Sequence, residues 1–207
     1  MTNDASQTGT YLAIVVAFAA LIGIAQSASA NQMGMEQLYV LLGEWRGVGD
    51  GKWGSHAAER NYSLILDGAF IQGRGLSVYP KQEKNQDGER HDSLSLYGFD
   101  QQRQTLVKRE FGNEAFVATY YLDAESSTDR RLVFVAENLE NVPTGWRARV
   151  TILTIGEDEF HELFELDTAK GEFELYVTTR FLRISKPSGG QVDFNLKRAP
   201  YPSTVRH

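Results

Sequence analysis

The chain has 207 residues, a formal net charge of −6 at pH 7 and no cysteine. Its length fits one domain with a single core, and its mildly acidic balance disfavours nucleic acid or anionic lipid as a partner. The lack of cysteine excludes disulfides, thiolate metal sites and cysteine nucleophiles.

The first thirty residues are predicted to be a signal peptide that is removed. An apolar run over residues 11–25 is followed by an A-x-A pattern ending at Ala30, which signal peptidase reads. The run is shorter than the roughly eighteen apolar residues that span a bilayer, so no permanent membrane anchor is expected. Asp4 and the lack of Lys or Arg before the run leave two alternatives, an uncleaved anchor or a start at Met33 or Met35. A disulfide-free exported domain suits a bacterial periplasmic or secreted location.

A short helix is predicted over residues 35–42. Met35, Leu38, Leu41 and Leu42 recur at helical spacing and form one apolar stripe, and Gly43 is placed to end the helix. We expect this helix to cover one mouth of a barrel.

The stretch over residues 41–51, LLGEWRGVGDG, is the most informative in the chain. If it is extended, Trp45 and the glycines at 43, 47, 49 and 51 all point to the same side. Glycine weakens a strand and is kept where the strand bends hard or where a ligand or another backbone comes close. The stretch therefore predicts the first strand of a small β-barrel, with Trp45 as a plug at its end.

Alternating patterns predict nine further strands separated by short turns, and Asp67-Gly68 favours a two-residue hairpin turn. About ten strands in this order predict an all-β fold, a single up-and-down antiparallel barrel over residues 31–185. A barrel of this size leaves space for a small ligand. The nine strands are expected at residues 62–66, 69–73, 94–99, 105–111, 115–122, 132–137, 146–155, 160–166 and 172–184.

Two polar segments are expected to lie outside the regular structure. Residues 80–92 are predicted to form a long mobile loop at one mouth, and residues 186–207, which are rich in Pro and Gly, a poorly ordered tail.

Charged and aromatic side chains on two strands raise the question of which face points inward. Tyr176 and Arg180 share a mixed face of the last strand, which either meets solvent or forms a polar cavity wall. Arg147 and Arg149 share another face and are expected in solvent, because a buried arginine pair needs carboxylates or an anionic ligand. If they did face inward, an acidic head group would be indicated for the ligand.

Histidine is the only obvious metal ligand or general base in the sequence. We expect His56 and His207 to be solvated and His91, beside Asp92, to be exposed. His161 lacks the spacing of a two-histidine zinc helix. No G-x-S-x-G elbow, phosphate loop or dinucleotide fingerprint is present, so no catalytic residue is predicted.

Residues 41–51 resemble the G-x-W-x-G-x-G opening of the nitrobindins, ten-stranded barrels related to fatty-acid-binding proteins and lipocalins in the calycin group. The segments 97–100, 141–149 and 158–165 are similar to uncharacterised bacterial exported barrel domains allied to that group. The likeness spans roughly residues 35–185 and implies the same barrel fold.

The resemblance also implies a haem site, held in nitrobindins through a histidine on a strand near the C-terminus. The corresponding strand here contains no histidine, and Tyr176 is its only side chain that could ligate iron. His161 is the other weak candidate for a haem ligand. Lipocalins pack the first-strand tryptophan against an arginine of the last strand, which implies a structural cation–π pair of Trp45 with Arg183 or, failing that, Arg180.

Three functions follow. The favoured one is an exported, non-catalytic barrel that holds a small, largely apolar or amphipathic molecule, because the strand count and the glycine-bent strand come without a catalytic constellation. The alternatives are a haem-binding barrel with nitrosyl or peroxide chemistry and a ligand-free structural or interaction barrel. The residues expected to contact a ligand are Trp45, Gly47, Gly49, Tyr176 and Arg180.

Overall fold

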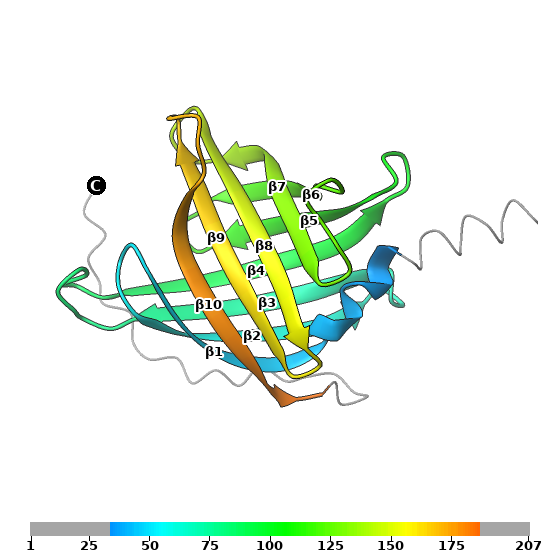
Figure 1. Cartoon of the computed structure of the whole chain (residues 1–207), viewed down its shortest axis with the longest axis horizontal. Helices are drawn as coiled ribbons and strands as arrows, with labels where there is room; N and C mark the ends of the chain where they lie inside the picture. The colour runs from blue at the N-terminus through cyan, green and yellow to red at the C-terminus, as the bar shows by residue number, and fades with distance from the viewer. Residues whose placement is uncertain (1–33, 187–207) are drawn as a thin grey trace, which may run out of the picture.

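The computed structural model describes residues 34–186, which form ten antiparallel strands closed into one barrel (Figure 1). Each strand pairs with its neighbours in sequence, and β10 closes the barrel against β1. The predicted up-and-down barrel of about ten strands is confirmed. The strands are β1 (Gly43–Gly51), β2 (His56–Ile65), β3 (Phe70–Tyr79), β4 (Glu89–Asp100), β5 (Thr105–Gly112), β6 (Val117–Leu122), β7 (Arg131–Glu140), β8 (Trp146–Gly156), β9 (Glu159–Thr168) and β10 (Glu174–Ser185).

The segment before β1 is less helical than predicted. It holds one helical turn at residues 34–36 and the 3₁₀ turn η1 (Tyr39–Leu41) instead of one continuous helix. A segment this short has little intrinsic helical stability, so its contacts decide its shape. Met35, Leu38 and Leu41 are buried in the core, and the segment lies across one end of the barrel. We call this the closed end.

Several boundaries differ from the prediction. β2 begins at His56, β3 continues to Tyr79 and β4 begins at Glu89, so the connection that was expected over residues 80–92 covers only residues 80–88. The polar start of β4 pairs fully with β3, as in the pair Ser77↔His91. Its charged side chains point to the barrel mouth or to solvent, where polarity is compatible with a strand.

Two connections are shaped differently from the prediction. The β2–β3 turn has four residues, 66–69, because the ladder ends at the pair Ile65↔Phe70. The amide of Gly68 donates to the carbonyl of Ile65 at 3.1 Å. The connection 80–88 is tied to the β1–β2 connection, residues 52–55, by the amide side chain of Gln82. This side chain accepts from the Ser55 amide at 2.9 Å and donates to the Ser55 carbonyl at 2.8 Å.

Rings from neighbouring strands cover the glycines of the inner face. The Phe181 ring lies 2.6 Å from where a Cβ at Gly47 would stand, and the Tyr62 ring lies 2.7 Å from that position at Gly73. The His56 ring covers Gly49 in the same way. The glycine-rich opening of β1 is therefore required by close approach, as predicted, and the approaching groups are the protein's own side chains and the backbone carbonyls of β10.

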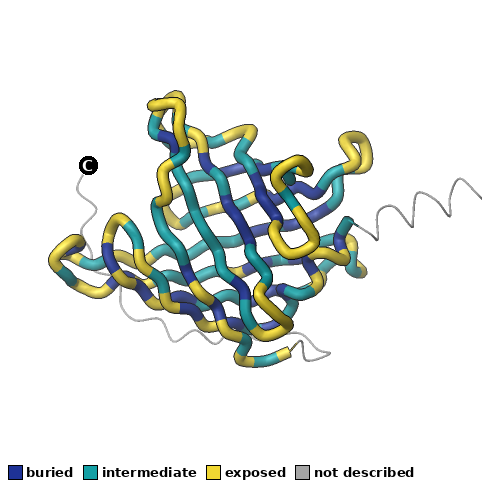
Figure 2. The backbone as a smooth tube through the Cα atoms, viewed as in Figure 1, coloured by how far each residue is buried: buried dark blue, intermediate teal, exposed yellow. Residues whose placement is uncertain are grey.

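Most inward-facing residues near the closed end are almost completely buried (Figure 2), while Phe99 and Leu122 are partly buried. A side chain that bordered a water-sized cavity would retain accessible surface, so no such cavity lies beside the fully buried side chains of this half. These side chains are Trp45, Tyr62, Ile71, Tyr97, Leu106, Leu132, Phe134, Ile152, Phe160 and Phe181, each between 0% and 3% exposed.

The predictions for residues 1–30 and for the tail after residue 186 lie outside the described residues. Within residues 34–186, no helix combines the length and the apolar character that crossing a membrane requires.

Candidate functional site

The opposite end of the barrel, formed by the connections 52–55, 80–88, 113–116, 141–145 and 169–173, has a different interior. Here large apolar side chains that face inward remain partly exposed. Phe164 and Leu166 of β9 pair with the inward-facing Val150 and Ala148, so both lie on the inner face of the barrel. This region, the upper chamber, has an apolar wall made of Phe116, Ala136, Leu139, Phe164, Leu166 and Val177.

The facing wall of the upper chamber is polar. His56 stacks on Tyr79 with ring centroids 4.6 Å apart, and Tyr79 meets the edge of His91 at 5.6 Å. His91 binds Glu114 through Nδ1 and Glu89 through Nε2, the latter at 3.1 Å. The hydrogen bond that His91 donates to the Glu114 carboxylate raises the pKa of His91, whereas burial and then the charge of Arg60 lower the pKa of His56. Burial also raises the pKa of Tyr79 to about 12.

The floor of the upper chamber is a layer of four charged side chains, Arg60, Lys108, Glu110 and Glu162, which we call the charged layer. Arg60 donates to Glu162 at 2.8 Å, and Lys108 donates to Glu110 at 2.9 Å. The side chain of Lys108 is only 3% exposed, while those of Arg60 and Glu162 are 14% and 15% exposed. The layer is therefore largely shielded from water.

Arg60, Lys108 and Glu162 of the charged layer are ionised at neutral pH. Burial by itself would raise the pKa of Glu162, but the charges of Arg60 and Lys108 outweigh it and hold the pKa below its ordinary value. For Lys108 the cost of burial is overcome by Glu110, and the pKa is raised. Directly beneath, burial raises the pKa of the Tyr62 and Tyr97 hydroxyls well above 10, so they stay neutral.

The predicted cation–π pair is present, and its arginine is Arg183. The guanidinium carbon lies 4.0 Å from the centre of the Trp45 ring. Arg183 also donates to the carbonyls of Leu42 at 2.5 Å and Val40 at 2.8 Å, which ties the closed-end segment to the last strand. The Trp45 indole nitrogen donates to the Leu41 carbonyl at 2.6 Å. Trp45 thus closes the barrel from within the packed half.

The five residues expected to contact a ligand do not come together. Trp45 is 1% exposed, and Gly47 and Gly49 lie under the rings of Phe181 and His56. Arg180 points to the outer surface, where it binds Glu159 at 2.7 Å with a side chain 54% exposed. Only Tyr176 lies beside the chamber wall, with its ring centre 5.9 Å from that of Phe164. The interior expected at β1 is filled by side chains from other strands.

The candidate haem ligands do not fit a haem site. His161 is on the outer face of β9, where its Nε2 lies 3.0 Å from Glu159. The hydroxyl of Tyr176 accepts a hydrogen bond from the Trp53 indole nitrogen at the rim of the barrel. These two side chains point to different sides of the wall, and neither offers a free ligand atom to the interior.

His56 corrects the sequence-based expectation that it is solvated, because it is 5% exposed inside the barrel. His91, with a side chain 40% exposed, is at the rim and held by two carboxylates. Its neighbour Asp92 does not orient it, since Asp92 binds Arg90 at 2.8 Å. No role was predicted for Arg60 or for the three other members of the charged layer.

The outward direction of Arg147 and Arg149 is confirmed. Arg147 binds Asp167 at 2.7 Å and Arg149 binds Glu165 at 2.5 Å, both on the outer face. A weak signal for the charged layer did exist, because Lys108 and Glu110 fall on the same side of β5 as the apolar Leu106. A strand face that mixes charged and apolar residues does not show by itself whether it points into the barrel or to solvent; the neighbouring strands decide this.

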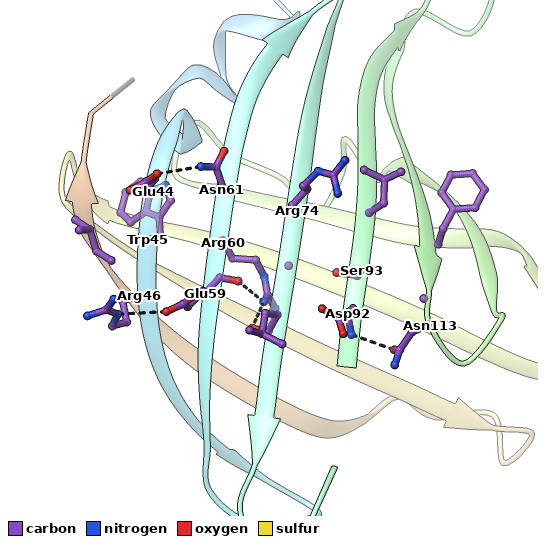
Figure 3. Close-up of a pocket in the computed structure, with 16 residues that line it drawn as sticks. Glu44, Trp45, Arg46, Glu59, Arg60, Asn61, Arg74, Asp92, Ser93 and Asn113 are labelled. Atoms are coloured by element: carbon purple, nitrogen blue, oxygen red, sulfur yellow. Dashed lines mark hydrogen bonds and ion pairs between the residues drawn. The ribbon is translucent and has the colours of Figure 1, made fainter. Parts of the chain in front are cut away.

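A groove of about 510 Å³ crosses the outer surface of β1–β5 (Figure 3). One side carries Glu44, Asn61 and Arg74, and the other carries Glu59 and Asp92. At its ends lie apolar side chains, including Phe111 and Ile184, which are 40% and 51% exposed. The groove therefore mixes both charges with apolar surface, and Arg60 of the charged layer is also among its lining residues.

No protein-family model and no curated protein sequence matches this chain. Among solved structures, it is similar to the crystal structure of Rv2717c from M. tuberculosis, with a TM-score of 0.50 and 14% identity over 72% of this chain and 96% of that chain. The S-type phycobiliprotein lyase CPES from Guillardia theta follows at 0.47 and 11%, covering 78% and 98% of the two chains. The structure of EF1p2_mFAP2b bound to DFHBI gives 0.40 and 8%, covering 72% and 98%. At 14% identity, the likeness to Rv2717c shows the barrel fold alone.

Proposed function

We propose that this protein binds one small amphipathic molecule in its upper chamber and does not transform it. The observation that carries the proposal is the change along the inner face: side chains at the closed end are buried, whereas Phe164, Leu166 and Val177 keep accessible apolar surface. Inward-facing apolar side chains that remain exposed to water favour ligand binding, because a ligand that displaces the water buries their apolar surface.

The two walls suit a molecule with one apolar and one polar side. An alkyl or ring portion would lie against the Phe164 wall, where each buried methylene contributes about 0.8 kcal/mol. The polar part would reach toward the charged layer. The Glu162 carboxylate is held ionised by Arg60 and is not poised near neutral pH as a general base would be, which favours binding over catalysis.

The test compares one chamber variant with one surface variant. Leu166→Arg places a long charged side chain in the chamber, whereas Leu182→Arg changes a residue of β10 that is 46% exposed on the outside. Titration with the uncharged fluorescent probe N-phenyl-1-naphthylamine should show saturable binding to the wild type and to Leu182→Arg and none to Leu166→Arg. Native mass spectrometry of protein purified from its own host should show a carried small molecule. Equal binding by all three proteins would refute the proposal.

We also propose that the protein is exported, as the apolar run and the A-x-A pattern of the first thirty residues indicate. N-terminal sequencing of the protein from its host should begin at Asn31. A chain that begins at Met1, Met33 or Met35 would contradict export by this signal.

The outer groove favours a second candidate, a barrel that acts through a partner protein. Phe111 is 40% exposed on this groove without belonging to the chamber. Under this alternative, Phe111→Asp would abolish capture of a partner while leaving probe binding in the chamber unchanged.

A further inference from the structure

We propose that the upper chamber selects an uncharged, hydroxyl-bearing amphiphile, such as a monoacylglycerol, over a fatty-acid anion of the same chain length. The proposal rests on the proposed function and names the chemical class of its ligand. It follows from how the charges at the chamber floor are already matched and from one buried nitrogen in the chamber wall.

The cations of the charged layer are engaged by the protein itself. Arg60 donates to Glu162 at 2.8 Å, and also to the carbonyls of Glu59 at 3.0 Å and Leu76 at 3.2 Å. Its guanidinium lies 5.0 Å from the centre of the Phe181 ring. A ligand carboxylate would have to replace one of these partners, so Arg60 offers it no net gain in charge pairing.

Lys108 is matched in the same way. Its ammonium binds Glu110 at 2.9 Å and lies 5.0 Å from the centre of the Tyr120 ring and 6.0 Å from that of Tyr97. The layer thus contains two cations and two carboxylates in pairs. A ligand carboxylate would be the third in this layer. It would lose its hydration beside Glu110 and Glu162 and would find no unpaired cation to compensate.

The entrance adds two more carboxylates. Glu89 and Glu114 both bind His91 at the rim, with side chains 43% and 42% exposed. Above the pKa of His91, these two groups carry net negative charge at the entrance and oppose an approaching anion. An uncharged ligand meets no such barrier.

His56 supplies a recognition group for a neutral ligand. Its Nε2 lies 2.9 Å from the hydroxyl of Thr179, while its buried Nδ1 has no hydrogen-bond partner among the described residues. Burial keeps the ring neutral, so Nδ1 is either a donor or an acceptor, depending on the tautomer. A ligand hydroxyl can accept from a protonated Nδ1 or donate to an unprotonated Nδ1, whereas a carboxylate can only accept from the protonated one.

The position of His56 connects it to the charged layer. Thr179 of β10 is the direct register partner of Glu162 on β9, so the ring lies one side chain away from the Arg60–Glu162 pair. The Tyr79 ring, 8% exposed, covers His56 on its other side. A ligand hydroxyl therefore reaches Nδ1 when the Tyr79 ring turns away from the stack, and relieving the unsatisfied nitrogen stabilises that arrangement.

The test uses two probes with the same acyl chain, 1-monododecanoylglycerol and dodecanoate, each below the concentration at which it forms micelles. Isothermal titration at pH 7.5 should show the glycerol ester binding the wild type roughly tenfold or more tightly than the anion. Glu162→Gln leaves Arg60 without its carboxylate and should raise the affinity for dodecanoate by roughly tenfold. Glu110→Gln, which releases Lys108, makes the same test if the first variant does not fold.

His56→Phe keeps a ring that can stack on Tyr79 and removes Nδ1. It should weaken binding of the glycerol ester several-fold and leave dodecanoate unchanged. The control is Glu165→Gln, which alters a carboxylate of the outer face that binds Arg149 and should change neither affinity.

The results separate this inference from the proposed function. Equal affinity of the wild type for both probes, or tighter binding of dodecanoate, overturns the ligand class while the chamber remains a binding site. An unchanged preference in both Glu162→Gln and Glu110→Gln also overturns it. If the wild type binds neither probe and no fluorescent probe enters the chamber, the proposed function itself is wrong.

Discussion

One face of β9 passes through both halves of the barrel. Phe160 is 1% exposed, the side chain of Glu162 is 15% exposed, and Phe164 and Leu166 remain partly exposed. These residues alternate on the same strand and all point inward, so the strand itself does not cause the difference. What changes is the size of the side chains that they meet.

At the closed end, β9 meets large partners. Phe160 stacks on Phe181 with centroids 4.7 Å apart and receives the edge of Trp45 at the same distance. At the open end, Phe164 and Leu166 pair with the smaller Val150 and Ala148 of β8. Smaller partners cover less of these two side chains, which stay partly exposed. The closed half therefore stabilises the barrel, and the open half is available to a ligand.

The largest effect expected from this difference is on stability. Phe134 is 0% exposed in the closed half, so Phe134→Ala should lower the free energy of unfolding by about 3–5 kcal/mol. Phe164→Ala removes the same ring from the open half, where part of it is already in water, and should cost only about 1 kcal/mol. Urea unfolding of the two variants measures the contrast. Similar losses would mean that the two halves are packed alike.

The next effect concerns the latch between the first and last strands. Arg183→Ala removes the contact with the Trp45 ring and the hydrogen bonds to the Leu42 and Val40 carbonyls, and should destabilise the protein by about 2–3 kcal/mol. Arg180→Ala, three residues away, removes an exposed ion pair and should cost less than about 1 kcal/mol. Thermal unfolding of both variants ranks them. An Arg180 variant as unstable as the Arg183 variant would contradict the latch.

The closed half was also the part that the sequence predicted best. The glycines around Trp45 and the alternation of the later strands are local patterns, and they correctly indicated a barrel and a close approach of other groups to β1. The pair of Trp45 with Arg183 came from a resemblance to a known group. Each of these signals lies in the residues of one strand or one motif.

The site could not be predicted in the same way because its contacts join distant strands. Arg60 and Glu162 are 102 residues apart, and His56 and Thr179 are 123 apart. In the sequence, Arg60 stands in a polar run and His56 follows a turn, so both were missed or assigned to solvent. Their burial depends on the order in which ten strands close. A mixed face reveals its direction only when its neighbours are known.

A smaller effect tests how closely the closed half is packed around β1. Gly47→Ala places a methyl group against the Phe181 ring, which stands 2.6 Å from that position, and should cost about 1.5 kcal/mol. Gly156→Ala is the matched control, because nothing lies within 4 Å of its Cβ position, and it should change stability by less than about 0.5 kcal/mol. Chemical denaturation of both variants decides the point. Equal tolerance of alanine would show that the ring over Gly47 can move freely.

The smallest effect separates the two histidines of the polar wall by the sign of their pH dependence. The pKa of His56 is lowered in the fold, so the unfolded chain binds more protons, and stability falls as the pH drops below 6.5 through the folded pKa. The pKa of His91 is raised, so its contribution is complete below 6.5 and is lost as the pH rises through the folded pKa. His56→Phe should therefore reduce the loss of stability on acidification, and His91→Gln should increase it. The midpoints of urea unfolding between about pH 5 and pH 8 measure both slopes. Parallel slopes in the two variants would mean that the buried histidine and the rim histidine have the same environment, which the geometry of the chamber contradicts.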